Sequence, residues 1–227
     1  MEPPDWIQPL LGRVRSARAE DFTRLVTPTS GGRPSAVLVL LGEDAEHGPD
    51  VLMLQRAATL RNHAGQPAFP GGAADPGDPG PAGTALREAR EEVDLDPDSV
   101  TVLAELPRLW IPVSDFVVTP VLGWWHRPHP VRSRDPGEVA HVARLPVAEL
   151  VDPGNRLRVR HPSGWIGPAF QVRGMLVWGF TAGVLDALLT MGGWARPWHA
   201  DRVADLPAAP APAAAADEVA ELAGPLP

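Results

Sequence analysis

Three glutamates crowd one short segment of this chain, Glu88, Glu91 and Glu92 in "TALREAREEV" (84–93). If the segment is helical, residues three and four apart lie on neighbouring turns of the same side, so the three carboxylates project together. Clustered carboxylates repel one another unless cations lie among them. Hard oxygen ligands of this kind suit Mg²⁺ or Mn²⁺, which share their ligands with substrate phosphates. The spacing therefore predicts a divalent-cation site on a helix.

A second interpretation of the same segment is a solvated helix face, on which Arg87 and Arg90 pair with neighbouring glutamates. The loop in front favours the metal site. Gly71 and Gly72 follow a proline, and a glycine pair lets the backbone approach a ligand closely and expose its amides and carbonyls. In a metal site, Arg87 would anchor the glutamates from behind.

The elements around this helix predict a mixed fold. Short stretches rich in Val and Leu, bounded by Gly, Pro and Asp, predict β-strands. They cover 35–41, 50–57, 100–109, 115–125 and 138–145, followed by a short helix at 146–150 and a hairpin over 155–172. A helical apolar period begins near residue 177 and stops at Gly192. The order predicts an α/β (α+β) fold, an α/β/α sandwich with the charged helix packed on a mixed sheet.

The ends of the chain are less regular. Residues 1–30 suggest an irregular N-terminal arm with a short helix near 18–26, and the Ala/Pro-rich segment 204–227 suggests a disordered tail. The core domain is expected to span 31–203, a normal size for one domain.

Bulk composition excludes several classes of protein. The net charge is −8, which argues against a general nucleic-acid binder. No apolar run approaches the roughly 20 residues that span a bilayer, and the acidic, Pro-rich start does not resemble a signal peptide. With no cysteine, any metal must be held by oxygen or nitrogen ligands. We therefore expect a cytoplasmic protein, and the sequence leaves monomer and homodimer both open.

The glycine pair and the charged helix together resemble the Nudix box, written G, five residues, E, seven residues, R-E-U-x-E-E-x-G-U, with U an aliphatic residue. The matching positions are Gly72, Arg87, Glu88, Ala89, Glu91, Glu92 and Leu95. Three departures are present: Asp78 stands at the first Glu, eight residues instead of seven separate it from Arg87, and Asp94 replaces the second glycine. An Asp tolerates the left-handed conformation that a helix exit needs.

The segment "LMLQRAATLRNHAGQPAFPGG" (52–72) is similar to the signature of the coenzyme A pyrophosphatase branch of that family, L-L-T-x-R-S-x-x-x-R-x-x-x-G-x-V-x-F-P-G-G. The positions in register are Leu52, Arg56, Arg61, Gly65, Phe69, Pro70, Gly71 and Gly72. Of these, Arg56, Arg61, Gly65 and Phe69 are our candidate substrate-binding residues. Guanidinium groups fork onto phosphate oxygens, which suits a substrate with a diphosphate and a 3′-phosphate.

The resemblance implies a hydrolase that uses Mg²⁺ or Mn²⁺ to cleave the diphosphate linkage of coenzyme A or its acyl derivatives, releasing 3′,5′-ADP and (acyl-)4′-phosphopantetheine. It implies Gly72, through a backbone carbonyl, with Glu88, Glu91 and Glu92 as metal ligands. Arg87, Glu88 and Glu91 would be the catalytic residues, with Glu91 as a further ligand or water-positioning base. A carboxylate from a later loop, Glu138, is a second candidate for the base.

Two alternatives are retained. The chain could hydrolyse another nucleoside diphosphate derivative, such as ADP-ribose or a dinucleotide. From a different class, it could be a catalytically silent nucleotide-binding module, with Asp78 and Asp94 marking decay. The intact set of three glutamates argues against the second alternative.

Overall fold

A computed structural model describes residues 2–28, 30–60 and 63–206. Its largest element is an eight-stranded mixed sheet with the order β3-β2-β1-β7-β5, to which β4 adds on β1, β6 on β7 and β8 on β2. The strands are β1 (Arg33–Asp44), β2 (Gly48–Arg56), β3 (Pro67–Ala68), β4 (Gly71–Ala73), β5 (Val100–Glu105), β6 (Leu109–Ile111), β7 (Phe116–Trp125) and β8 (Val139–Pro146). Only the β1–β7 pair of this sheet is parallel, so the predicted mixed sheet is confirmed.

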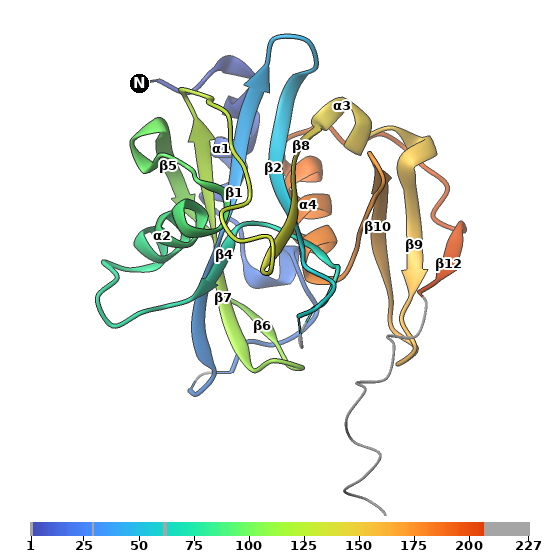
Figure 1. The fold of residues 1–227 in the computed structure, drawn as a ribbon. Helices are drawn as coiled ribbons and strands as arrows, with labels where there is room; N and C mark the ends of the chain where they lie inside the picture. The colour runs from blue at the N-terminus through green and yellow to red at the C-terminus, as the bar shows by residue number, and fades with distance from the viewer. Residues whose placement is uncertain (1, 29, 61–62, 207–227) are drawn as a thin grey trace, which may run out of the picture.

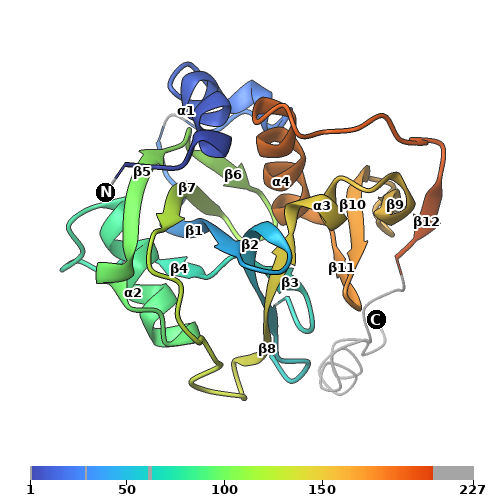
Figure 2. The same cartoon turned by 90° about the horizontal axis from the view of Figure 1, so that it is seen from above.

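Helices cover both faces of this sheet (Figures 1 and 2). Helix α2 lies on one face, and helices α1 and α4 lie on the other. The helices are α1 (Gln8–Val14), α2 (Pro81–Val93), α3 (Val147–Leu150) and α4 (Gly179–Met191), with short 3-10 turns at Asp5–Ile7, Ala19–Asp21, Pro97–Ser99 and Pro153–Asn155. The arrangement is the predicted α/β/α sandwich.

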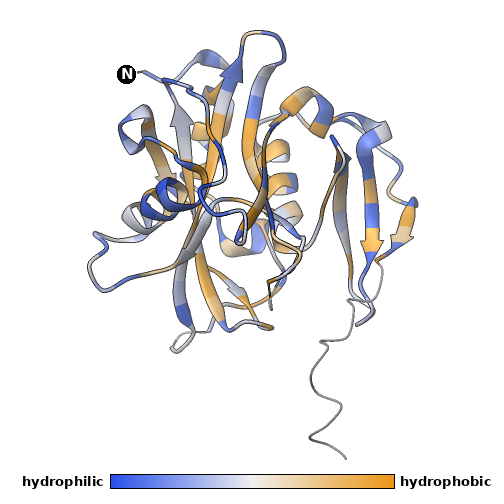
Figure 3. Cartoon of the chain, viewed as in Figure 1, coloured by the Kyte–Doolittle hydropathy of each residue, from blue (hydrophilic) through white to orange (hydrophobic). Residues whose placement is uncertain are grey.

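The alternation of side chains along β1 shows how one strand serves two cores. Successive residues of a strand point to opposite faces. Leu38 and Leu40 pack against α2, whereas Val39 and Leu41 pack towards α1 and α4. All four are at most 3% exposed, which is why the strand is apolar throughout rather than alternating with polar residues. Figure 3 shows this apolar character in the central strands and in α4.

A second sheet with the order β11-β10-β9-β12 stands beside α4. Its strands are β9 (Arg156–Arg160), β10 (Ile166–Val172), β11 (Met175–Val177) and β12 (Val203–Asp205). The predicted hairpin over 155–172 is confirmed as β9 and β10. The sequence did not indicate β11, which takes the residues immediately before α4, or β12, which pairs in parallel with β9.

The N-terminal segment differs from the expected irregular arm. It contains helix α1, and the segment 18–26 forms only a single 3-10 turn. Ile7 and Leu10 are 0% exposed and belong to the core on the α4 side. Pro9 sits in the first turn of α1, where its missing N–H is not needed. The predicted tail lies almost entirely outside the described residues, as do Met1, Thr29, Arg61 and Asn62.

The burial of α1 predicts that truncating Leu10 to Ala lowers the free energy of unfolding by about 2–5 kcal/mol, the usual result of removing a fully buried Leu side chain. Val26 of the same segment is 83% exposed, so Val26→Ala should change it by less than about 0.5 kcal/mol. Urea unfolding followed by circular dichroism measures both. Equal midpoints for the two variants would mean that α1 does not belong to the core.

Candidate functional site

Glu92 is the most buried carboxylate of α2, with 5% of its surface exposed. Its Oε2 accepts a hydrogen bond of 2.9 Å from the Gly71 N–H, and its Oε1 faces the Arg56 guanidinium at 3.8 Å. Burial raises the pKa of Glu92 to about 8, against the opposing effect of the Gly71 hydrogen bond, and repulsion from Glu88 acts in the same direction as burial. One oxygen is therefore fixed by the backbone and the other faces a cation.

Glu88 lies directly against Gly72. A Cβ atom on Gly72 would lie 2.5 Å from the Glu88 Oε1, so a larger residue here would displace the Glu88 carboxylate from its position. Burial raises the pKa of Glu88, and the Arg87 guanidinium opposes that rise. The Gly72 carbonyl in turn accepts a hydrogen bond of 2.6 Å from the Ser35 hydroxyl on β1. Gly72 thus approaches the Glu88 side chain closely, and the predicted approach of this backbone to a ligand stays a prediction.

Arg87 is held by several partners at once. Its Nε and Nη2 donate to the two oxygens of Asp78 at 2.9 and 3.1 Å, in the forked geometry typical of Arg and carboxylates. Nη2 also donates to the Ala73 carbonyl at 3.0 Å, and Nη1 donates to Glu88 at 3.0 Å and to Glu91 at 3.2 Å. The guanidinium therefore connects the loop, strand β4 and the glutamates.

The two Asp residues that depart from the Nudix box have defined roles in the geometry. Asp78 receives hydrogen bonds from the Thr84 hydroxyl and the Asp75 N–H as well as from Arg87, and these partners hold its pKa far below the usual value. Asp94 ends α2 in the left-handed conformation, with φ 60° and ψ 32°. Its backbone takes the conformation for which glycine is the usual choice.

Glu91 and Glu138 are the outer carboxylates. Glu91 is exposed and points to Arg87 rather than to Glu92. Glu138 comes from the loop before β8; its Oε1 lies 4.0 Å from the Arg56 Nη2, and its charge raises the pKa of both Glu88 and Glu92. Chain segments far apart in sequence thus bring a fourth carboxylate to the helix.

The residues present fit a divalent cation. Among 2–28, 30–60 and 63–206, no three Asp, Glu or His side chains already form a closed metal-ligand set. Glu92 is nevertheless a buried carboxylate and Glu88 a half-buried one, the charged forms of both are disfavoured, and an oxygen-binding cation would relieve this cost. Gly72 lies beside Glu88, and its carbonyl, which accepts one hydrogen bond from Ser35, keeps a second lone pair.

The remaining predicted residues lie at different distances from the carboxylates. Gly65 lies in the loop after β2 and has a φ of +66°. Its carbonyl accepts a hydrogen bond from the Gln55 side chain. Phe69 is 3% exposed and packs in the core on the α1 and α4 side, so it supports the loop there; its contact with a substrate stays a prediction. Arg61 lies outside the described residues. Ser35 was missed, because a single Ser at the start of an apolar run carries no signal of its own.

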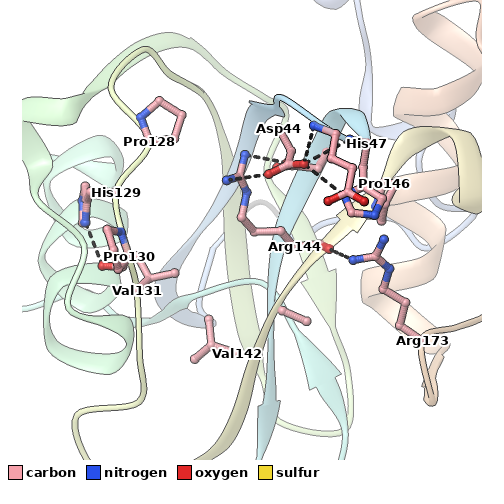
Figure 4. Close-up of a pocket in the computed structure, with 13 residues that line it drawn as sticks. Asp44, His47, Pro128, His129, Pro130, Val131, Val142, Arg144, Pro146 and Arg173 are labelled. Atoms are coloured by element: carbon pink, nitrogen blue, oxygen red, sulfur yellow. Dashed lines mark hydrogen bonds and ion pairs between the residues drawn. The ribbon is translucent and has the colours of Figure 1, made fainter.

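A cavity of about 600 Å³ lies away from these carboxylates, beside the first residues of β2, whereas Arg56 is at the strand's last residue. Figure 4 shows Arg144 extending from β8 towards Asp44, with the segment 128–131 on the other side of the space. The Arg144 Nη2 lies 2.6 Å from Asp50, whose pKa is raised by burial. This cavity and the cluster of glutamates are thus separate features.

The comparisons with known proteins agree with the glutamate helix. The NUDIX domain model matches residues 32–165, more than half of the chain. This chain belongs to the Nudix family. It is 40% identical over 162 residues to the uncharacterized Nudix hydrolase NudL of Cronobacter sakazakii (69% of this chain, 81% of that one), and 35% identical over 192 residues to NudL of Escherichia coli K12 (77% and 94%).

Among solved structures, a Nudix hydrolase from M. smegmatis, RenU, aligns with a TM-score of 0.48 and 18% identity, covering 75% of this chain and 91% of that one. Nudix membership implies hydrolysis of nucleoside diphosphate derivatives with the help of divalent cations. None of the helices in the described part of the chain is both long and apolar enough to span a membrane.

The forked bond between Arg87 and Asp78 predicts that Asp78→Ala lowers turnover by about 10- to 100-fold, because Arg87 would no longer be oriented towards Glu88. Asp75 is 66% exposed and lies 3.8 Å from the same guanidinium, so Asp75→Asn should change turnover by less than about twofold. Steady-state kinetics on any diphosphate substrate of the enzyme checks both. Equal losses in the two variants would contradict a specific role for Asp78.

The raised pKa of Glu92 predicts a pH dependence of stability in metal-free protein. The folded state holds this proton up to about pH 8 and the unfolded state only to about pH 4.5, so the unfolded state binds fewer protons between these values. Stability should therefore fall as the pH rises from about 4.5 to 8, by about 3–5 kcal/mol.

Glu92→Gln should remove most of this fall, because Gln does not ionise. Denaturant unfolding of the two proteins in chelator, at pH 5, 6.5 and 8, measures the difference. Parallel pH profiles would show that Glu92 ionises normally. Adding Mg²⁺ should restore the stability of the natural protein at pH 8 and leave the variant much less changed.

Proposed function

We propose that this chain hydrolyses the diphosphate linkage of coenzyme A or its acyl derivatives, with Mg²⁺ or Mn²⁺, giving 3′,5′-ADP and (acyl-)4′-phosphopantetheine. The observation that carries the proposal is the position of Arg56. This residue belongs to the segment that resembles the coenzyme A branch, and its guanidinium lies 3.8 Å from Glu92 on the metal helix. The branch-specific segment and the cluster of glutamates therefore form one site.

Glu88 and Glu92 would hold the cation, with the Gly72 carbonyl and Glu91 as further ligands. The bound cation would supply charge for the departing phosphate and lower the pKa of a water molecule. The Gly71 N–H fixes one oxygen of Glu92, and Arg87 fixes Glu88, so both carboxylates are oriented before any ligand arrives. Such preorganised groups are the main contribution of a protein to phosphoryl transfer.

Arg56 would orient the diphosphate, and Arg61, further along the same sequence motif, would bind a further phosphate. A general base would take a proton from the attacking water as its oxygen bonds to phosphorus and the bridging P–O bond breaks. Glu91 and Glu138 are the two candidates, and both are exposed enough to exchange a proton with solvent. Replacing the residue that acts as the base with Gln should remove the acidic limb of the pH–rate profile. The same replacement of the other candidate should leave that limb in place.

The geometry around Asp78 and Asp94 supports an active enzyme over a silent module. Asp78 makes the forked bond to Arg87, and Asp94 adopts the helix exit that the family expects of glycine. Both departures therefore preserve the arrangement of the glutamates.

Product identification tests the proposal. With coenzyme A and Mg²⁺ or Mn²⁺, mass spectrometry should detect 3′,5′-ADP and 4′-phosphopantetheine. Glu92→Gln should lower turnover by at least about a hundredfold, because it removes the negative charge that would bind the metal. It keeps an acceptor for the Gly71 N–H. Faster cleavage of ADP-ribose or of a dinucleotide than of coenzyme A would contradict the assignment of coenzyme A as the substrate. Binding without turnover of any of them would favour the silent module.

A further inference from the structure

Arg56 lies between two carboxylates without forming a hydrogen bond to either. Its Nη1 is 3.8 Å from the Glu92 Oε1 and its Nη2 is 4.0 Å from the Glu138 Oε1. Both distances are ion-pair distances, too long for hydrogen bonds. Its Nε is buried and has no hydrogen-bond partner in the described part of the chain. The guanidinium is thus held by charge alone, with a donor left over.

The backbone of Arg56, in contrast, is fixed. Its N–H donates to the Gln66 carbonyl at 3.0 Å, and the pairing of β2 with β8 shifts register at Gln55 and Arg56. A bulge of this kind re-aims a side chain near a strand end. Arg87 differs, because its guanidinium donates hydrogen bonds to five acceptor atoms, two of Asp78 and one each of Ala73, Glu88 and Glu91. Of these two arginines, Arg56 is the one whose side chain can move without breaking hydrogen bonds.

We propose that Arg56 is an exchangeable counter-ion: in the metal-free protein it pairs with Glu138 and with the ionised form of Glu92, and once a divalent cation is bound its guanidinium is released to the diphosphate. The inference rests on the cation-dependent diphosphate hydrolysis proposed above. It adds a competition between Arg56 and the cation for Glu92, and a handover of the Arg56 guanidinium from Glu92 to the diphosphate. Arg56 and the cation compete for the same oxygen, the Oε1 of Glu92, because Oε2 is engaged by the Gly71 N–H.

The handover follows from charge. A dication at Glu92 repels the guanidinium and satisfies the carboxylate that held it, so the Arg56 donors turn to the nearest other anion. A diphosphate bound at the cation offers oxygens that accept the fork of Nε and one Nη, including the Nε that has no partner in the metal-free protein. Arg56 therefore opposes cation binding in the absence of diphosphate and favours diphosphate binding in the presence of the cation.

Two variants separate these effects. Arg56→Ala removes the charge, and Arg56→Lys keeps the charge but not the fork. Arg90→Ala is the matched control, because it removes one positive charge from the exposed face of α2, away from Glu88 and Glu92. Circular dichroism and thermal unfolding first establish that each variant is folded.

The first measurement is Mn²⁺ binding by isothermal titration calorimetry at pH 9, above the pKa of Glu92, without any substrate. Arg56→Ala should bind Mn²⁺ at least about fivefold more tightly than the natural protein, since a charge about 4 Å away is removed. Arg56→Lys and Arg90→Ala should both stay within about twofold. Unchanged or weaker Mn²⁺ binding by Arg56→Ala overturns the competition.

The second measurement is the binding of imidodiphosphate, a diphosphate mimic that resists hydrolysis, to the Mn²⁺-saturated proteins. Arg56→Ala should bind it at least about tenfold more weakly, with Arg56→Lys between the two because it keeps the charge and loses the fork. Equal binding by all four proteins overturns the handover. Neither measurement uses coenzyme A, so a wrong substrate assignment would leave both results interpretable.

Discussion

The removal of Glu88 and Glu92 from water is the constraint on which the rest of the site depends. Glu92 is buried and Glu88 is half-buried on the same side of α2, and burial disfavours the charged form of each. The protein stabilises them with one backbone N–H and two guanidinium groups, and Gly72 leaves room for the Glu88 carboxylate. Each of these is weaker than a bound dication would be. The local structure is therefore stable enough to fold and still favourable for a metal ion.

Asp78 departs from the family pattern, and it still joins the loop to Arg87. An Asp side chain is one methylene shorter than Glu, and the loop to Arg87 is one residue longer than the family pattern. The longer loop lets the shorter carboxylate reach both Nε and Nη2 of Arg87. Because Thr84 and the Asp75 N–H also bind Asp78, its orientation is set by the loop and not by the length of its side chain. The two changes compensate each other.

Features that depend on neighbouring residues could be predicted from the sequence. The spacing of Glu88 and Glu92 and the apolar strands carried enough signal to place the metal helix on a mixed sheet, and Asp94 was compatible with the exit conformation observed. Helix α1 was not predicted, because its segment contains Pro9 and too few periodic apolar residues. The bond of Ser35 to Gly72 and the approach of Glu138 to Arg56 depend on strand pairing between distant segments, which no local pattern encodes.

The charges of the site also determine the order in which ligands can bind. In the described part of the chain, the positively charged partners of four carboxylates are the guanidinium groups of Arg56 and Arg87; the carboxylates belong to Glu88, Glu91, Glu92 and Glu138. Above the pKa of Glu92 the metal-free site is therefore net negative and repels a diphosphate, on a chain whose total charge is already −8. Cations must enter first to reverse the local field. Arg87 stays bound to Asp78 and so does not become available to phosphate. Arg56 is loosely held, and its release on cation binding would increase the affinity of the site for phosphate.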